Sequence, residues 1–596
     1  MAFSESNHRV SATGTAVQIG VIFGAVGTHE FKFAADEKLV KLSEYVMVHH
    51  ETHGWVLGQI VELERESNVT YNRAQMISVG ADVKVDSRLA AVVSVLGYKS
   101  DRGLIQMPHT PFSAGAEVYL ADNTLISDIV GLDPAGVTGA YVGILKGHDI
   151  PVNININTLV QKHVSIIAKT GSGKSYMAGV LIEELLKRNI PIVVIDPHGE
   201  YSSMLHPNLD EKDLRVMNKF SVVPRGYPNA VSEFSVDTEL NIGTSPLKLD
   251  GVRLQASELI PILSLKPTGM QLGILHQALK RVKEHTQYYT LRDLINEVLE
   301  DKNTLKWNLV NILEHLESLE LFSSNPTPLK ELVAPGKVTL INLRGVPPDI
   351  QDIVVAQLSH KLFDARKRMR IPAMLYVIEE AHNFCPQQGT SVSASILKTI
   401  ASEGRKFGLG LCVVSQRPAK VDKNVLSQCN TQIILKVTNP NDLKALVASV
   451  EGLDFRMTNE IQRLPVSVAL VSGGAINLPI LVEVRPRETK HGGRPVEIVD
   501  QKAAGLAMEE LSDPKSITGA GTDVEQPEGV DSDWYATLMA AYEDMIKSCK
   551  EPGLERPKPI GNDVKPEDDV KPDEEPEDLK WLTDKLEEPH KRREKR

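Results

Sequence analysis

The residues Ala168-Lys-Thr-Gly-Ser-Gly-Lys-Ser175 combine two glycines, a lysine and a hydroxyl group in a spacing suited to binding a phosphate chain. Glycines let backbone N–H groups approach phosphate oxygens closely, and a following helix N-terminus adds its dipole. Lys174 can then reach the β- and γ-phosphates of ATP, while the Ser175 hydroxyl can coordinate Mg²⁺. The first glycine usual in this motif is replaced by Ala168, which can take that position if its φ is negative. The residues expected to surround the phosphates are Lys169, Thr170, Gly171, Ser172, Gly173, Lys174 and Ser175.

A second candidate is the run Leu375-Tyr-Val-Ile-Glu-Glu-Ala-His382, in which apolar residues end in two carboxylates. Such a run predicts a strand that places acid at its carboxyl end, where α/β sheets bind their ligands. One carboxylate should bind Mg²⁺, and Glu379 fits that role. The other should orient and polarise the attacking water, and Glu380 fits that role.

Asp196 begins the string Asp196-Pro-His-Gly-Glu-Tyr201 directly after another expected strand. Two interpretations are equally favoured. Asp196 could assist with water or Mg²⁺ at the site, or it could simply form a turn with the following proline.

Three polar residues further along the chain could act on the transferred phosphoryl group. Gln416 follows an expected strand, where a polar side chain can sense the γ-phosphate. Arg405 or Arg417 could supply positive charge to the transition state, from the same subunit or from a neighbour. The basic run Arg366–Arg370 is expected at the end of a surface helix and is interpreted as a solvated face.

Alternating strands and helices must position these residues. Apolar runs predict strands at 163–168, 192–195, 338–342, 373–378, 410–415, 432–437, 466–471 and 478–484, and helices at 176–188 and 349–367. This order is typical of a parallel sheet covered on both faces. Helical spacing at 293–299 and 309–319 predicts an insertion over about 252–322. The fold class expected is therefore α/β, with a RecA-like P-loop core over 151–500.

The region in front of this core has a different pattern. Short glycine-punctuated β-segments are expected at 17–25, 45–49, 55–63, 90–97, 117–121 and 142–145, which predicts a small β-barrel over 14–150. Residues 151–158 are interpreted as a linker. Residues 1–13 are expected to be flexible, 501–550 to form an extension with one helix at 534–549, and 551–596 to form an acidic disordered tail.

The bulk composition is that of a globular protein. The net charge of −12 disfavours nucleic-acid binding at first sight, but residues 551–580 hold eleven acidic and five basic residues and so carry half of it. A local basic surface therefore stays possible. No apolar run approaches the roughly 18 residues needed to cross a bilayer. The four scattered cysteines and the absence of a signal-like N-terminus favour a reducing, cytoplasmic location.

Taken together, Thr170–Ser175, Asp196–Tyr201, Glu379–His382 and Ser415–Pro418, behind a small barrel, resemble the HerA family of archaeal DNA motors. The resemblance runs from about residue 14 to about residue 500. It implies an ATP-driven translocase of double-stranded DNA, working as a homo-hexamer with a HAS-type barrel ring stacked on a RecA-like ring. It also implies a NurA-type nuclease as partner and a role in resecting DNA ends during double-strand break repair.

The same resemblance assigns roles to individual residues. It implies that Lys174 and Ser175 hold phosphate and Mg²⁺, that Glu380 is the catalytic glutamate and that Asp196 assists it. It makes Arg405 a finger offered to the adjacent subunit. A basic residue just before the phosphate-loop strand contacts nucleotide in the family, and Lys162 is the nearest match.

Two alternatives belong to other classes. One is a conjugation or secretion ATPase that moves DNA or protein at a membrane, which the missing membrane segment weakens. The other is a ring-shaped scaffold that uses nucleotide only to assemble, which the presence of both Lys174 and Glu380 disfavours.

Overall fold

The computed structural model describes residues 17–132, 136, 139–252, 259, 269–286, 288–318, 321–450, 453, 455–474 and 476–493. The expected flexible N-terminus (1–13), the helix at 534–549 and the acidic tail lie outside these residues. The first element is a closed barrel of six strands. These are β1 (Gln18–Phe23), β2 (Glu30–Ala35), β3 (Tyr45–His50), β4 (Gly54–Ser67), β5 (Ser87–Lys99) and β7 (Glu117–Leu120). They pair in the order β2-β1-β7-β3-β4-β5, and a β2–β5 pairing closes the ring.

The barrel differs from the expectation in one strand. The segment at 142–145 was expected to complete it, but that segment lies in β8 (Gly139–Leu145), which pairs with β9 (Pro151–Asn155) and belongs to the second sheet. The interpretation of 151–158 as a linker is also wrong, because β9 and α3 (Ile156–Lys162) occupy it. Strand β2 takes the vacant place in the barrel, because Phe31 and Phe33 alternate along it and fill the barrel interior.

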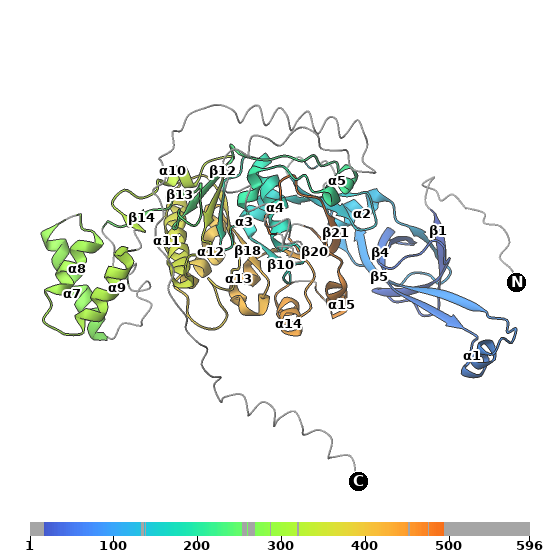
Figure 1. Ribbon diagram of the computed structural model, residues 1–596. Coiled ribbons are helices and arrows are strands. Elements are labelled where there is room, and N and C mark those ends of the chain that lie inside the picture. The colour runs from blue at the N-terminus through green and yellow to red at the C-terminus, as the bar shows by residue number, and fades with distance from the viewer. Residues whose placement is uncertain are drawn as a thin grey trace, which may run out of the picture. The chain divides into compact units, whose positions relative to one another are not determined.

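The second sheet has twelve strands and carries the core (Figure 1). Its first eight strands run parallel, in the order β13 (Ser245–Pro246), β12 (Val231–Ser235), β16 (Val338–Asn342), β11 (Ile192–Asp196), β17 (Met374–Ile378), β18 (Leu409–Ser415), β10 (Val164–Ile167) and β19 (Thr431–Ile434). The antiparallel strands β20 (Val468–Gly473), β21 (Ile480–Val484), β8 and β9 extend it. The expected parallel α/β core is therefore confirmed.

Helices cover both faces of this sheet. Successive buried residues of β11 alternate between two hydrophobic clusters, with Ile192 and Val194 in one and Val193 and Ile195 in the other. The first cluster contains α4 (Lys174–Lys187) and α3. The second contains α11 (Pro348–Lys367) and α12 (Ala394–Phe407). Because both faces of the sheet are buried, its parallel strands are continuous runs of apolar residues in the sequence.

Within its described residues, the stretch where a helical insertion was expected contains three helices that interrupt the α/β order. They are α7 (Gly269–His285), α8 (Leu291–Leu299) and α9 (Lys306–Ser318). A short parallel pair, β14 (Leu249–Asp250) and β15 (Phe322–Ser323), brings the two ends of the segment together. Other helices of the core are α5 (Glu211–Met217), α10 (Leu329–Leu332), α13 (Lys423–Gln428), α14 (Pro440–Ser449) and α15 (Phe455–Arg463).

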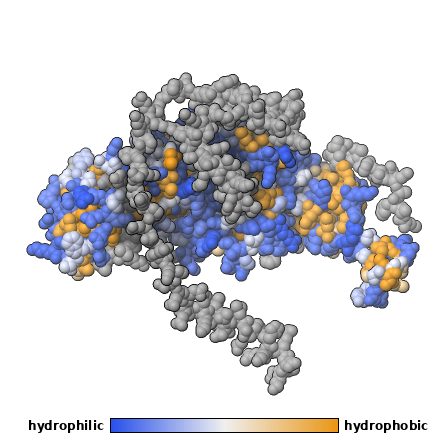
Figure 2. All heavy atoms as spheres, in the orientation of Figure 1, coloured by the Kyte–Doolittle hydropathy of each residue, from blue (hydrophilic) through white to orange (hydrophobic). Residues whose placement is uncertain are grey.

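The hairpin of β4 and β5 is longer than the rest of the barrel and carries α1 (Tyr71–Ser78), which buries none of its residues. Apolar side chains lie on its surface (Figure 2), and Tyr71 and Val79 are 78% and 83% exposed. A second short helix, α2 (Asn123–Val130), packs against β5 instead. None of the helices in the described ranges is long and apolar enough to cross a membrane.

Candidate active site at the carboxyl edge of the parallel strands

The loop between β10 and α4 has the geometry that phosphate binding needs. Gly171 and Gly173 adopt φ values of +73° and +94°, a region that favours glycine. Ala168 is fully buried and is not among the residues with positive φ, so alanine fits the position that usually holds glycine. Ser175 lies in the first turn of α4, next to the N-terminal end of its dipole.

Lys174 joins this loop to the end of β17. Its ammonium lies 2.5 Å from Glu380 Oε1 and 2.9 Å from Glu379 Oε2. All three side chains are largely buried. Burial alone would lower the pKa of Lys174, but the two carboxylates outweigh it and raise that pKa. The structure therefore brings together the lysine and both glutamates that the sequence singled out.

Glu380 has a strained backbone. Its φ is +48°, a left-handed value that non-glycine residues rarely adopt. Such strain persists where the surrounding structure fixes it, commonly at functional sites. His382 supports the carboxylate: its Nδ1 lies 3.2 Å from both Glu380 Oε2 and Ser415 Oγ. Burial lowers the pKa of His382, so the ring is neutral near pH 7.

Tyr201 was not expected at the site. Its hydroxyl donates a hydrogen bond to Glu379 Oε1, and burial raises the pKa of this phenol well above its usual value. Asp196 lies beneath it and accepts backbone N–H bonds from His198, Gly199 and Tyr201. These bonds favour the turn-forming interpretation of Asp196, whose loop then positions Tyr201.

Burial, helped by nearby Glu379, raises the pKa of Asp196 to about 6. An unfolded chain would hold Asp196 near its ordinary pKa of about 3.9. Between about pH 4 and pH 6, Asp196 is therefore protonated in the folded state and ionised in the unfolded state. The free energy of unfolding falls as pH rises through that window. We predict that the unfolding free energy of the wild type, relative to Asp196→Asn, falls by about 3 kcal/mol between pH 4 and pH 7. Urea unfolding of both proteins across this range measures it, and a difference that stays level or grows with pH would contradict the assignment.

Gln416 also joins the site. It follows β18, and the hydroxyl of Thr170 in the phosphate loop donates a hydrogen bond to its side-chain oxygen. Arg417 is exposed beside it and helps to lower the pKa of His382. The end of β18 therefore touches both the phosphate loop and the Glu380 region.

Lys162 and Arg405 do not join this group. Lys162 ends α3 just before β10, about 13 Å of strand away from the phosphate loop. Arg405 lies in the last turn of α12, just before β18, whose seven residues span about 23 Å. Both exposed side chains therefore lie at the amino edge of the parallel strands, opposite Lys174. The nucleotide contact that the resemblance implies for Lys162 stays a prediction, and this placement puts Lys162 away from the phosphate loop of its own subunit.

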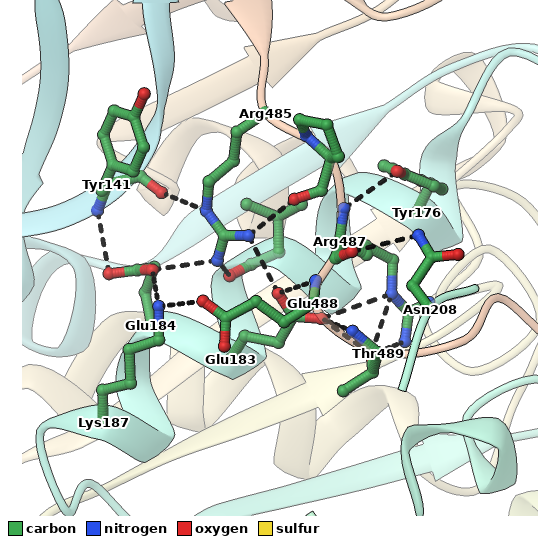
Figure 3. Close-up of polar contacts among 12 residues, drawn as sticks. Tyr141, Tyr176, Glu183, Glu184, Lys187, Asn208, Arg485, Arg487, Glu488 and Thr489 are labelled. Atoms are coloured by element: carbon green, nitrogen blue, oxygen red, sulfur yellow. Dashed lines mark hydrogen bonds and ion pairs between the residues drawn. The ribbon is translucent and has the colours of Figure 1, made fainter. Parts of the chain in front are cut away.

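A buried ionic network anchors α4, the helix that carries Lys174 and Ser175 (Figure 3). Arg485 is fully buried and lies 3.0 Å from Glu183 and 2.9 Å from Glu184, both on α4. Arg487 packs over Gly179, where a Cβ would come within 2.4 Å of its guanidinium carbon. The sequence offered no sign of this network, because charged residues are normally exposed.

Removing one member of this network should be costly. Arg485→Met leaves Glu183 and Glu184 buried without their main partner, and breaking a buried pair in this way costs about 3–5 kcal/mol. The matched control is Lys219→Ala, which breaks a partly exposed ion pair with Glu483 and should cost under about 1 kcal/mol. Thermal unfolding of the two variants measures the contrast. Equal melting temperatures would show that the network does not hold α4.

Comparison with known proteins shows what this chain is similar to. Residues 140–362 match the sequence model of "Helicase HerA, central domain". The chain is 27% identical over 517 residues to the "Probable DNA double-strand break repair helicase HerA" of Methanocaldococcus jannaschii, covering 80% of this chain and 98% of the relative. It is 26% identical over 537 residues to the "DNA double-strand break repair helicase HerA" of Saccharolobus solfataricus, covering 85% and 99%. VirB4 of Thermoanaerobacter pseudethanolicus, a solved structure, superposes with a TM-score of 0.45 at 16% identity, covering 58% and 96%.

The sequence matches cover most of this chain and nearly all of each relative, and the site holds the lysine and paired glutamates of a P-loop enzyme. The chain is therefore similar to HerA helicases over most of its length, and its residues 140–362 match the central-domain model of these helicases.

Proposed function

We propose that this protein is an ATP-driven translocase of double-stranded DNA, that it works as a homo-hexameric ring, and that it feeds DNA to a NurA-type nuclease during double-strand break repair. The proposal rests on one observation. The Lys174 ammonium forms ion pairs with Glu379 and Glu380 at the carboxyl edge of the parallel strands. Phosphoryl transfer depends mainly on positioning and electrostatic stabilisation, which this cluster supplies.

The residues present suit Mg²⁺ and ATP. Glu379 Oε2 and Glu380 Oε2 are buried, with Lys174 Nζ 2.9 Å from the first and His382 Nδ1 3.2 Å from the second. Each carboxylate oxygen has a further lone pair that a metal ion or a water molecule could take. Ser175 and Glu379 would hold Mg²⁺, which neutralises phosphate charge when bound. ATP would draw Lys174 away from Glu380, because the β- and γ-phosphates compete for the same ammonium. Glu380 would then be free to polarise the attacking water, and Gln416 would sense the γ-phosphate from beside Thr170.

Two cations would act between subunits. Arg405 and Lys162 lie at the edge of the sheet opposite Lys174, which supports contact with the nucleotide of a neighbour. A ring of identical subunits uses such head-to-tail interfaces, in which one edge of each subunit faces the opposite edge of the next. ATP hydrolysis at each interface would then move subunits relative to one another.

The DNA substrate and the repair role rest on the relatives. Relatives matched over nearly their whole length are named DNA double-strand break repair helicases. A motor that tracks along DNA must grip the phosphate backbone, so binding should be independent of sequence and sensitive to salt. The barrel is the surface proposed for the nuclease.

The test is the ATPase rate with duplex DNA, with single-stranded DNA and without DNA, together with the native mass of the assembly. The proposal predicts a hexamer whose turnover is stimulated most strongly by duplex DNA. A monomer with DNA-independent turnover would contradict the ring-translocase proposal.

A further inference from the structure

Arg366, in the last turn of α11, is buried, and no carboxylate of the described residues pairs with it. It is 6% exposed, and burial alone lowers its pKa, with no acidic group of the described residues contributing. Buried arginines are usually paired with an acid, because an unpaired buried charge is costly. The sequence suggested that the run Arg366–Arg370 is a solvated face. That interpretation holds for exposed Arg368 and Arg370 but is wrong for Arg366.

Main-chain carbonyls take the place of a carboxylate. Arg366 Nε donates to the Phe407 carbonyl at 2.8 Å, and one terminal nitrogen donates to the same oxygen. The other terminal nitrogen donates to the Ile371 carbonyl. Phe407 is the last residue of α12, where carbonyls lack partners within the helix and the dipole is negative. The Arg366 guanidinium therefore stabilises this helix end in two ways. It donates hydrogen bonds to an unpaired carbonyl, and its positive charge interacts favourably with the negative end of the helix dipole.

The last turn of α12 is also the turn that carries Arg405. His163 lies close to this turn, because a Cβ on Gly404 would come within 3.5 Å of its ring. The Nδ1 of His163 accepts a hydrogen bond from the Leu411 backbone. Burial lowers the pKa of His163 to about 4, so the ring beside Arg405 is uncharged near pH 7. Arg366 therefore holds the helix end through hydrogen bonds, and neither Arg366 nor His163 occupies the Arg405 guanidinium.

We propose that Arg366 is a positioning residue that fixes the end of α12, so that Arg405 presents its guanidinium to the site of the neighbouring subunit. The inference rests on the proposed role of Arg405 between subunits. Lysine is a poor substitute, because its single nitrogen cannot hold two carbonyls on separate segments in a fixed geometry.

Two variants test the role, and a third is the control. Arg366→Met keeps the apolar stem and removes the guanidinium, and it should lower kcat at least about tenfold by displacing the finger. Arg366→Lys should recover part of that loss. Arg368→Met, two residues further along and exposed, should turn over at the wild-type rate. Wild-type turnover by Arg366→Met would overturn the proposal.

Mixed rings separate a displaced finger from a damaged site. Arg366→Met subunits keep their own Lys174 and Glu380, whereas Glu380→Gln subunits keep a well-placed Arg405. Co-expressing the two in equal amounts should raise ATPase activity above either variant alone, to about a quarter of the wild-type rate if interfaces form at random. If Arg366→Met is too unstable to purify, Arg366→Lys is mixed in the same way.

A parallel mixture of Arg405→Ala with Glu380→Gln subunits separates the positioning role of Arg366 from the role of Arg405 between subunits. Recovery in both mixtures supports both roles. Recovery with Arg405→Ala but not with either Arg366 variant overturns the positioning role alone. No recovery with Arg405→Ala overturns the role of Arg405 between subunits, and the positioning role with it.

Discussion

Replacing Glu380 by glutamine should lower kcat for ATP hydrolysis by about 10²- to 10⁴-fold, the range typical of a lost general base. Glutamine matches glutamate in size but cannot accept a proton from water. The structure holds this carboxylate between Lys174 and His382 on a strained turn, so its position is defined before ATP binds. Steady-state ATPase assays with and without duplex DNA measure the change.

The variant should still bind ATP and assemble, because the phosphate loop and α4 are untouched. Glu314→Gln, an exposed substitution on α9, controls for the loss of a carboxylate elsewhere and should leave turnover unchanged. Near-wild-type hydrolysis by Glu380→Gln would mean that another group activates the water.

Replacing Arg405 by alanine should lower kcat about 10³-fold or more, the effect typical of a lost arginine finger. Arg405 cannot reach the nucleotide of its own subunit, because about 23 Å of strand separates it from the carboxyl edge, so the loss should arise at the neighbouring site. Assembly and nucleotide binding should persist, since Arg405 is exposed and belongs to neither the phosphate loop nor the sheet core.

Arg417 is the matched comparison, because it was the other candidate finger and it lies beside the site of its own subunit. Mixing with Glu380→Gln subunits should restore the activity of Arg405→Ala. Any activity that Arg417→Ala loses should not be restored in this way, because Arg417 lies beside the site of its own subunit. The reverse result would move the finger to Arg417 and place it in the same subunit.

The sequence predicted those parts of the site that follow directly from strand ends. Ser175 lies after β10 and Glu379 after β17, and parallel strands bring their carboxyl ends to one edge. The apolar runs also predicted the core strands, since both faces of the sheet are buried.

Other parts depend on tertiary contacts that local patterns do not encode. Strand β8 has the same short apolar character as a barrel strand, and only its pairing with β21 and β9 assigns it to the core. Tyr201 ends the motif Asp196–Tyr201 in the sequence, but only the folded loop brings its hydroxyl to Glu379.

Buried arginines were missed for a physical reason. Arg485 and Arg366 are buried because groups from distant segments bind their guanidinium groups. Arg485 pairs with two carboxylates of α4, and Arg366 donates to the carbonyl at the end of α12. Charge in a sequence indicates exposure on average, and these two residues are exceptions created by the fold.

The central claim is that ATP hydrolysis moves this protein along duplex DNA, and displacement of a third strand from a triplex measures that movement directly. The claim predicts that the wild-type protein strips the labelled third strand in the presence of Mg²⁺ and ATP. Glu380→Gln, or the wild type with a non-hydrolysable ATP analogue, should leave it bound. Rapid DNA-stimulated ATP hydrolysis by the wild type with no strand displaced would contradict translocation.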